Sequence, residues 1–153
     1  MRIGATRTLE DVQRELSLLN VVRIRHSYLS WDYSTPISTS SSSFGKYGPA
    51  VFTVETEAGD TVEFDYFVEC SAGTSGGLVS TRLSRGSQGR GLVRRGRVSG
   101  SYTTGIDLTI HSKVRDLPPP GKNEYTLQWS VTGAATAYSA GAEIFITVYS
   151  SVG

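Results

Sequence analysis

Strict alternation of apolar and polar side chains marks the last third of the chain. One face of the segment 125–132 collects its large apolar residues: Tyr125, Leu127, Trp129 and Val131. Residues 143–150 alternate in the same way, and one phase of that segment holds Ile144, Ile146 and Val148. A period of two among β-branched and aromatic residues predicts antiparallel strands with a packed face. A small-residue segment, 133–142, joins the two, so we expect a closing hairpin.

A second pair of strands is predicted in the middle of the chain. Segments 50–57 and 61–69 flank Ala58-Gly59-Asp60, a short connection with glycine that is typical of a hairpin. In the second of these segments Val62, Phe64, Tyr66 and Val68 share the face expected to be buried. The other face carries Phe67 among three acids: Glu63, Asp65 and Glu69.

The remaining strands are shorter and separated by glycine, serine or proline. A first strand is expected from residue 21, and others at 78–83, 92–98, 99–104 and 106–111. The serine run 38–43 fits either a flexible loop or an exposed edge strand. Residues 116–121, rich in proline, predict a rigid surface connection. Eight to ten strands at this spacing indicate an all-β antiparallel sandwich or jelly roll.

A helical pattern precedes the strands. Thr8 is a candidate N-cap, and apolar residues then recur at three- and four-residue steps: Leu9, Val12, Leu16 and Leu19. This stripe is narrow, and a helix of this length needs a partner to be stable. Two interpretations stand, an amphipathic helix on its own domain or a short parallel coiled coil at an oligomer axis. The narrow stripe favours the coil.

Composition supports this organisation. The 153 residues are 38% hydrophobic and rich in glycine, serine and threonine, which fits one turn-rich β domain and an appendage. We expect an N-terminal docking or oligomerisation segment at 1–33 and a sandwich domain at 34–153. No apolar segment suggests a secretory signal or membrane insertion, and the formal net charge of +1 argues against a dedicated nucleic-acid binder.

No residue pattern indicates catalysis, a cofactor or a metal. His26 and His111 lie far apart in sequence, and serine is abundant without a Gly-x-Ser-x-Gly motif. Cys70, the only cysteine, lies in an apolar strand pattern that predicts a buried, inert thiol. Carboxylates on one hairpin could serve a glycosidase, but solvated residues on an outer sheet face explain them more simply.

A cluster of arginines stands above this background. Residues 82–97 contain no acid and hold six of them: Arg82, Arg85, Arg90, Arg94, Arg95 and Arg97. Arginine binds phosphate, carboxylate or sulfate through two parallel hydrogen bonds. Three interpretations remain: contact with an anionic ligand, a solvated hairpin, and salt bridges to the acidic segment 55–69 of a neighbouring subunit. The third is favoured.

Parts of the sequence resemble bacteriophage tail and fibre proteins. In such proteins a loop near L-x-P-G precedes a strand like H-T-V-T-L-Q-W, as residues 117–129 do here with Leu-Pro-Pro-Pro-Gly-Lys-Asn-Glu-Tyr-Thr-Leu-Gln-Trp. A Gly-Thr-Ala stretch and a closing strand follow at 133–138 and 144–148, and a segment like the family's opening lies at 44–54. The resemblance covers residues 34–149. Glu124 stands where the family usually has histidine, and the arginine hairpin is heavier here.

The resemblance implies a jelly roll similar to C1q and tumour-necrosis-factor modules, usually a homotrimer, placed on a virion without a catalytic residue. The leading hypothesis is therefore a non-enzymatic minor tail or fibre protein that contributes to host-surface attachment and contacts other virion proteins. The alternatives are a capsid decoration or head-fibre protein, and a carbohydrate-binding or carbohydrate-active sandwich. If the ligand is a host-surface glycan, Tyr47, Tyr102 and Tyr138 are candidate contacts, although packing within strands explains them more simply.

Overall fold

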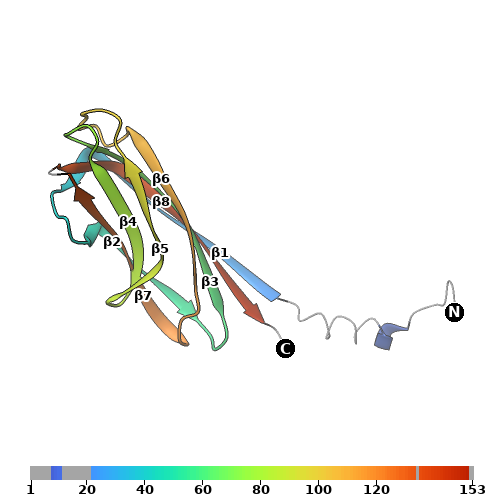
Figure 1. The fold of residues 1–153 in the computed structure, drawn as a ribbon. Helices are drawn as coiled ribbons and strands as arrows, with labels where there is room; N and C mark the ends of the chain where they lie inside the picture. The colour runs from blue at the N-terminus through green and yellow to red at the C-terminus, as the bar shows by residue number, and fades with distance from the viewer. Residues whose placement is uncertain (1–7, 12–21, 134, 152–153) are drawn as a thin grey trace, which may run out of the picture.

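The computed structural model describes residues 8–11, 22–133 and 135–151, and in these ranges the chain is almost entirely β-strand. Eight strands follow one another: β1 (Val22–Thr39), β2 (Gly45–Thr56), β3 (Thr61–Ala72), β4 (Leu78–Arg85), β5 (Gln88–Arg97), β6 (Leu108–Asp116), β7 (Gly121–Thr132) and β8 (Ala137–Ser151). They form two layers, with the long β1 and β8 running along one of them (Figure 1).

The strands form two four-stranded sheets whose order identifies the fold. The first sheet has the order β1-β8-β3-β6 and the second has the order β2-β7-β4-β5, with every pair antiparallel. Successive strands therefore cross from one sheet to the other at every connection except that between β4 and β5. This alternation between two facing sheets is the jelly-roll arrangement. The predicted all-β antiparallel sandwich is confirmed.

Two predicted hairpins are wrong. The strands on either side of Ala58-Gly59-Asp60 are β2 and β3, and the two closing strands are β7 and β8; in each case the members lie in different sheets. The Asp60 carboxylate accepts a hydrogen bond from the Glu57 backbone N–H at 2.8 Å, which closes the first connection. Alternation specifies which face of a strand is buried, but a short glycine turn can lead to a neighbouring strand or across to the facing sheet.

The core fills the space between the sheets, and the predicted buried faces supply it. The residues on the buried faces of β3, β7 and β8 are each at most 5% exposed to solvent: Val62, Phe64, Tyr66, Val68, Tyr125, Leu127, Trp129, Val131, Ile144, Ile146 and Val148. Trp129 meets the edge of Tyr47 with 5.1 Å between ring centroids, and Phe64 packs on Tyr125 at 4.6 Å. Cys70 is completely buried among them, as predicted.

The connections differ from expectation at two places. Residues 137–142 of the predicted small-residue connection belong to strand β8. The predicted strand 99–104 is part of an irregular loop between β5 and β6, and its backbone groups bond to neighbouring segments; the Tyr102 N–H, for example, donates to Ala72. Gly105, within this loop, has a positive φ of 77°, and an added Cβ there would clash with the Ala140 backbone nitrogen. The serine run begins in strand β1, which ends at Thr39, and continues as a loop to β2; the prolines connect β6 to β7 as expected.

The N-terminal helix is described only at its start. Residues 9–11 are helical, and Thr8 caps them because its hydroxyl accepts the Asp11 N–H at 3.2 Å. Leu9 is 72% exposed, whereas Val12, Leu16 and Leu19 lie outside the described residues. The coiled-coil seam and the division at residues 33 and 34 stay predictions. β1 runs across that division and pairs with β8 on both sides of it.

Candidate functional surfaces

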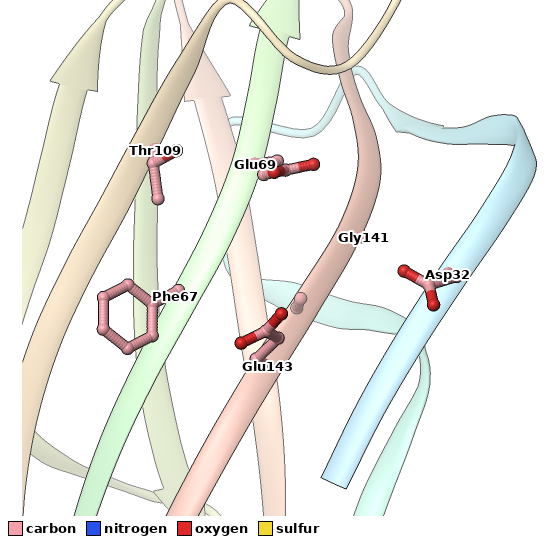
Figure 2. Close-up of a pocket in the computed structure, with 7 residues that line it drawn as sticks. Asp32, Phe67, Glu69, Thr109, Gly141 and Glu143 are labelled. Carbon is pink, nitrogen blue, oxygen red and sulfur yellow. The ribbon is translucent and has the colours of Figure 1, made fainter.

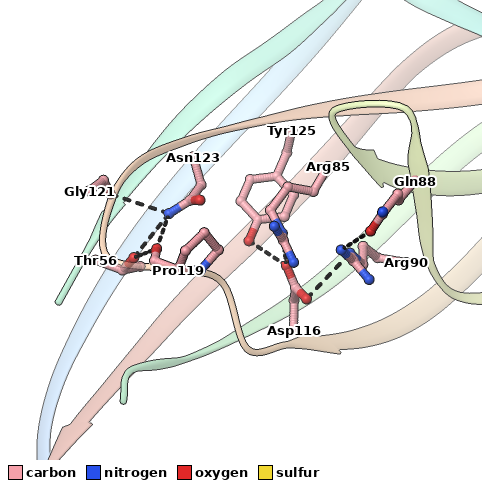
Figure 3. Close-up of polar contacts among 9 residues, drawn as sticks. All are labelled: Thr56, Arg85, Gln88, Arg90, Asp116, Pro119, Gly121, Asn123 and Tyr125. Atoms are coloured by element: carbon pink, nitrogen blue, oxygen red, sulfur yellow. Dashed lines mark hydrogen bonds and ion pairs between the residues drawn. The ribbon is translucent and has the colours of Figure 1, made fainter. Parts of the chain in front are cut away.

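Two of the six clustered arginines form a buried ionic centre within the chain. Asp116, at the end of β6, receives Arg85 at 2.8 Å and Arg90 at 3.5 Å, and the Tyr125 hydroxyl donates to the same carboxylate at 2.7 Å (Figure 3). Gln88 then accepts a hydrogen bond from Arg90 at 2.6 Å. Asp116 is only 7% exposed. Because its partners lie on β4, β5 and β7, this network ties β6 of the first sheet to three strands of the second.

A neutral hydrogen-bond cluster lies beside the ionic centre. The Asn123 side-chain N–H group donates to the Thr56 hydroxyl at 3.0 Å and to the Pro119 carbonyl at 2.9 Å (Figure 3). Thr56 donates in turn to the same Pro119 carbonyl. The proline connection is thereby fixed to β2 and β7, which holds Asp116 opposite the β4–β5 hairpin.

The surroundings of Asp116 keep it ionised. Burial alone would raise the pKa of its carboxyl, but the hydrogen bonds from Arg85 and Tyr125 and the charges of Arg85 and Arg90 outweigh burial and lower it. Glu63 on β3 is also held below its ordinary pKa, chiefly by its hydrogen bond from Arg115. The Asp60 pKa is lowered too, against its burial, by the Glu57 N–H and the nearby Arg25 charge.

Acid is therefore expected to destabilise the fold. The carboxyls of Asp60, Glu63 and Asp116 bind protons less readily in the folded chain than in the unfolded chain, so their stabilisation is complete above the ordinary pKa values of 3.8 for aspartate and 4.5 for glutamate. It is lost as the pH falls through those values and below. Thermal unfolding followed by circular dichroism should show a melting temperature that falls from pH 6 to pH 2.5. A melting temperature that stays constant over this range would contradict the assignment.

The other clustered arginines have different surroundings. Arg82 donates to Gln128 at 2.7 Å and lies 4.2 Å over the Phe44 ring, and Arg97 donates to the Gly76 carbonyl at 3.0 Å. Arg94 and Arg95 are exposed on β5, an edge strand. Within the described part of the chain, neither takes part in an ion pair or a side-chain hydrogen bond. Among the described residues, four of the six arginines thus have partners, whereas Arg94 and Arg95 have none.

The outer face of the first sheet carries an aromatic row that the sequence did not single out. Tyr28 on β1 contacts Phe145 on β8 with 4.9 Å between ring centroids, and Phe145 meets Phe67 on β3 at 6.3 Å. Phe67 then stacks on His111 of β6 at 4.4 Å. The row crosses all four strands, and its first two rings are 51% and 44% exposed. An exposed row of this kind is typical of a contact surface.

An acidic hollow lies beside this row, at the bare backbone of Gly141. It has a volume of about 210 Å³, and its rim carries the carboxylates of Asp32, Glu69 and Glu143 with the Phe67 ring (Figure 2). The three acids are exposed, and none forms an ion pair with another described residue. Gly141 lies between Asp32 and Glu69, its neighbours across the sheet, and an added Cβ there would meet the Trp31 carbonyl oxygen at 2.6 Å.

Two of the acids considered for catalysis are held in ion pairs within the described residues. Glu63 pairs with Arg115 at 3.0 Å and Lys113 at 3.4 Å, and Asp65 pairs with His111. Burial raises the pKa of the Cys70 thiol to about 12, which leaves it without nucleophilic thiolate. Among the described residues, no group of three histidine, cysteine or acidic side chains is placed to hold a metal ion.

The tyrosines considered for sugar contact are not alike. Tyr47 is fully buried, and its hydroxyl hydrogen-bonds to Ser139, so it is a packing residue. Tyr102 is 48% exposed in the loop before β6, and Tyr138 is half-buried.

In the described ranges, no helix is both long and apolar enough to cross a membrane.

Comparisons with known proteins find similarity in the path of the backbone but not in sequence. No protein-family profile matches the sequence, and no curated protein sequence is significantly similar to it. A crystal structure of the infectious bursal disease virus VP2 subviral particle is 13% identical, with a TM-score of 0.46 over 86% of this chain and 38% of that one. The structure of the Gx strain of the same virus is 11% identical, with a TM-score of 0.38 over 84% and 37%. The chain spans less than two fifths of either.

The sequence contained a signal for part of the outer face. In the closing strand, Phe145 and Tyr149 lie on the face opposite to that of Ile144. This strand therefore carries apolar or aromatic residues on both faces. A large apolar residue on the otherwise polar, outer face of a strand indicates a contact surface on that face. The approach of Asp32, Glu69 and Glu143 depends on strand order and could not be inferred.

Proposed function

We propose that this chain is a non-enzymatic structural protein of a bacteriophage particle, a homotrimeric minor tail or fibre protein that contributes to host-surface attachment. The observation that carries the proposal is the position of the fibre-like phrase in the fold. Residues 117–129 form the proline connection and most of β7, a central strand of the second sheet, and the phrase ends on the core residue Trp129. The phrase thus coincides with a structural strand of a jelly roll.

The chemistry of the described residues supports a binding role. The paired acids of β3 are engaged by β6, the thiol is buried, and the uncommitted polar and aromatic groups lie on outer faces and the edge strand β5. The carboxylates of the acidic hollow and the exposed rings of the aromatic row are available for contacts with other molecules. The helix that Thr8 begins would organise the trimer or dock it on the particle.

Labelling of particles tests the place of the protein. An antibody raised against the purified chain, bound to the phage whose genome encodes it and viewed by electron microscopy, should decorate the tail tip or fibres. The same antibody, as monovalent fragments, should reduce adsorption of the phage to host cells. Labelling confined to the capsid shell, with adsorption unchanged, would replace this proposal with a decoration protein. Particles without label would contradict a virion role.

The predicted helix seam gives a direct test of the trimer. Leu16→Asp places a charge in the apolar stripe, and a carboxylate there loses hydration without gaining a partner, so assembly should weaken. We expect the mass measured by sedimentation equilibrium to fall from trimer toward monomer at micromolar concentration. Gln13→Asp, on the expected outer side of the helix, is the matched control and should leave the mass unchanged. Equal masses for wild type and Leu16→Asp would contradict the seam.

A further inference from the structure

Two surfaces carry opposite charges that no other described residue of the chain pairs with. The acidic hollow presents Asp32, Glu69 and Glu143 on the outer face of the first sheet. Arg94 and Arg95 are exposed on β5, at the far edge of the second sheet. The hollow opens outward from β1, β8 and β3, whereas β5 is the edge strand of the second sheet, and within the described residues neither arginine forms an ion pair with an acid of the hollow. A second copy can bring arginines to the hollow.

We propose that the acidic hollow of one copy binds arginine side chains from β5 of a second copy. A guanidinium group recognises a carboxylate through two parallel hydrogen bonds and also lies favourably against an aromatic ring. The hollow offers both, because three unpaired carboxylates surround it and Phe67 forms part of its wall. The exposed Tyr28 and Phe145 beside it add apolar area to the same contact.

The chain already pairs arginine with a carboxylate and, separately, with an aromatic ring. Asp116 receives Arg85 and Arg90 together, and Arg82 lies over the Phe44 ring. The hollow combines the same two elements, carboxylates and an aromatic ring, without an arginine of its own.

The contact joins different surfaces on the two copies. Such a head-to-tail arrangement closes into a ring when the rotation between copies allows it. A three-membered ring would fit the homotrimer of the proposed function, on which this inference rests for its copy number. The contact itself requires only self-association.

Charge reversal tests the contact. Asp32→Lys with Glu143→Lys, and separately Arg94→Glu with Arg95→Glu, should each raise the dissociation constant for self-association at least about tenfold, because like charges then face one another. The full chain carrying all four changes should recover to within about threefold of wild type. Glu124→Lys, exposed on β7 away from both surfaces, is the control for net charge and should have little effect. Sedimentation equilibrium measures the dissociation constant of each variant, both in the chain that keeps Leu16 and in the chain that also carries Leu16→Asp.

A disulfide trap gives a second, positional readout. Cys70 is buried, so cysteines introduced on the surface are the ones that oxidise. A chain with Glu143→Cys and Arg95→Cys should form covalent oligomers under mild oxidation, whereas Glu124→Cys with Arg95→Cys should remain monomeric on a non-reducing gel.

The outcomes separate this inference from the proposed function. Recovery in the four-fold variant together with the selective disulfide supports the contact. Unchanged dissociation constants in both reversal variants, failure of the four-fold variant to recover, or equal crosslinking by the two cysteine pairs would overturn it. If the contact fails while Leu16→Asp still dissociates the protein and antibody still labels the tail, the proposed function stands without it.

Discussion

Replacing Trp129 with alanine is expected to lower the free energy of unfolding by about 4 kcal/mol, as large-to-small changes of buried aromatic residues do. Trp129 is 2% exposed at the centre of the sandwich, and its ring meets the edge of Tyr47. Tyr47 in turn hydrogen-bonds to Ser139 of the facing sheet, so the cavity would loosen a contact between the two layers. Urea unfolding followed by circular dichroism measures the loss.

Trp31→Ala is the matched control for this change. Trp31 lies on the edge strand β1, half-buried, and contacts Phe52 at a ring-centroid distance of 6.4 Å. Its replacement should cost about half as much, because less apolar surface returns to water on unfolding. Equal losses for the two tryptophans would contradict the assignment of Trp129 to the centre of the core.

The sequence was sufficient to predict which side chains are buried in the principal strands. In β7, for instance, Leu127 and Trp129 are buried while the intervening Gln128 is only partly so, as alternation predicts. The physical reason is that a strand with one packed face must place apolar residues at every second position. Burial of Cys70 followed from the same argument, since its position continues the buried phase of β3.

Strand partners could not be predicted, and the functional surfaces depend on them. The sequence placed β2 beside β3, whereas β3 pairs with β6 and β8. Only this pairing brings Glu69 and Asp32 to opposite sides of Gly141, although the two acids are 37 residues apart in sequence. Alternation is a local property, whereas strand order is set by how two complete sheets cover one another.

The arginine cluster shows the same limit for charge. All six side chains looked alike in a segment without acid, and the acid that pairs with two of them, Asp116, is supplied by β6. Arg94 and Arg95 on β5 became candidates for contact with another molecule only after the structure showed partners for the other four arginines. A charge cluster read from sequence therefore overstates the charge available for contact with other molecules.

Asp116→Ala is the second change expected to have a large effect, about 3 kcal/mol in the free energy of unfolding. The change leaves the guanidinium groups of Arg85 and Arg90 without a counter-charge, and their side chains are 21% and 25% exposed. It also leaves the Tyr125 hydroxyl, which donates to the same carboxylate, without its acceptor. A buried group that loses its acceptor or counter-charge costs more than the pair contributed.

Two further variants separate charge from packing in this result. Asp116→Asn keeps the shape and one acceptor oxygen, so it should lose less than alanine but still more than about 1 kcal/mol. Asp65→Ala removes an exposed carboxylate that pairs with His111, and it should cost less than about 1 kcal/mol because water screens that pair. Urea unfolding at pH 7 gives all three values. If Asp116→Ala costs no more than Asp65→Ala, then the ionic centre does not hold the two sheets together.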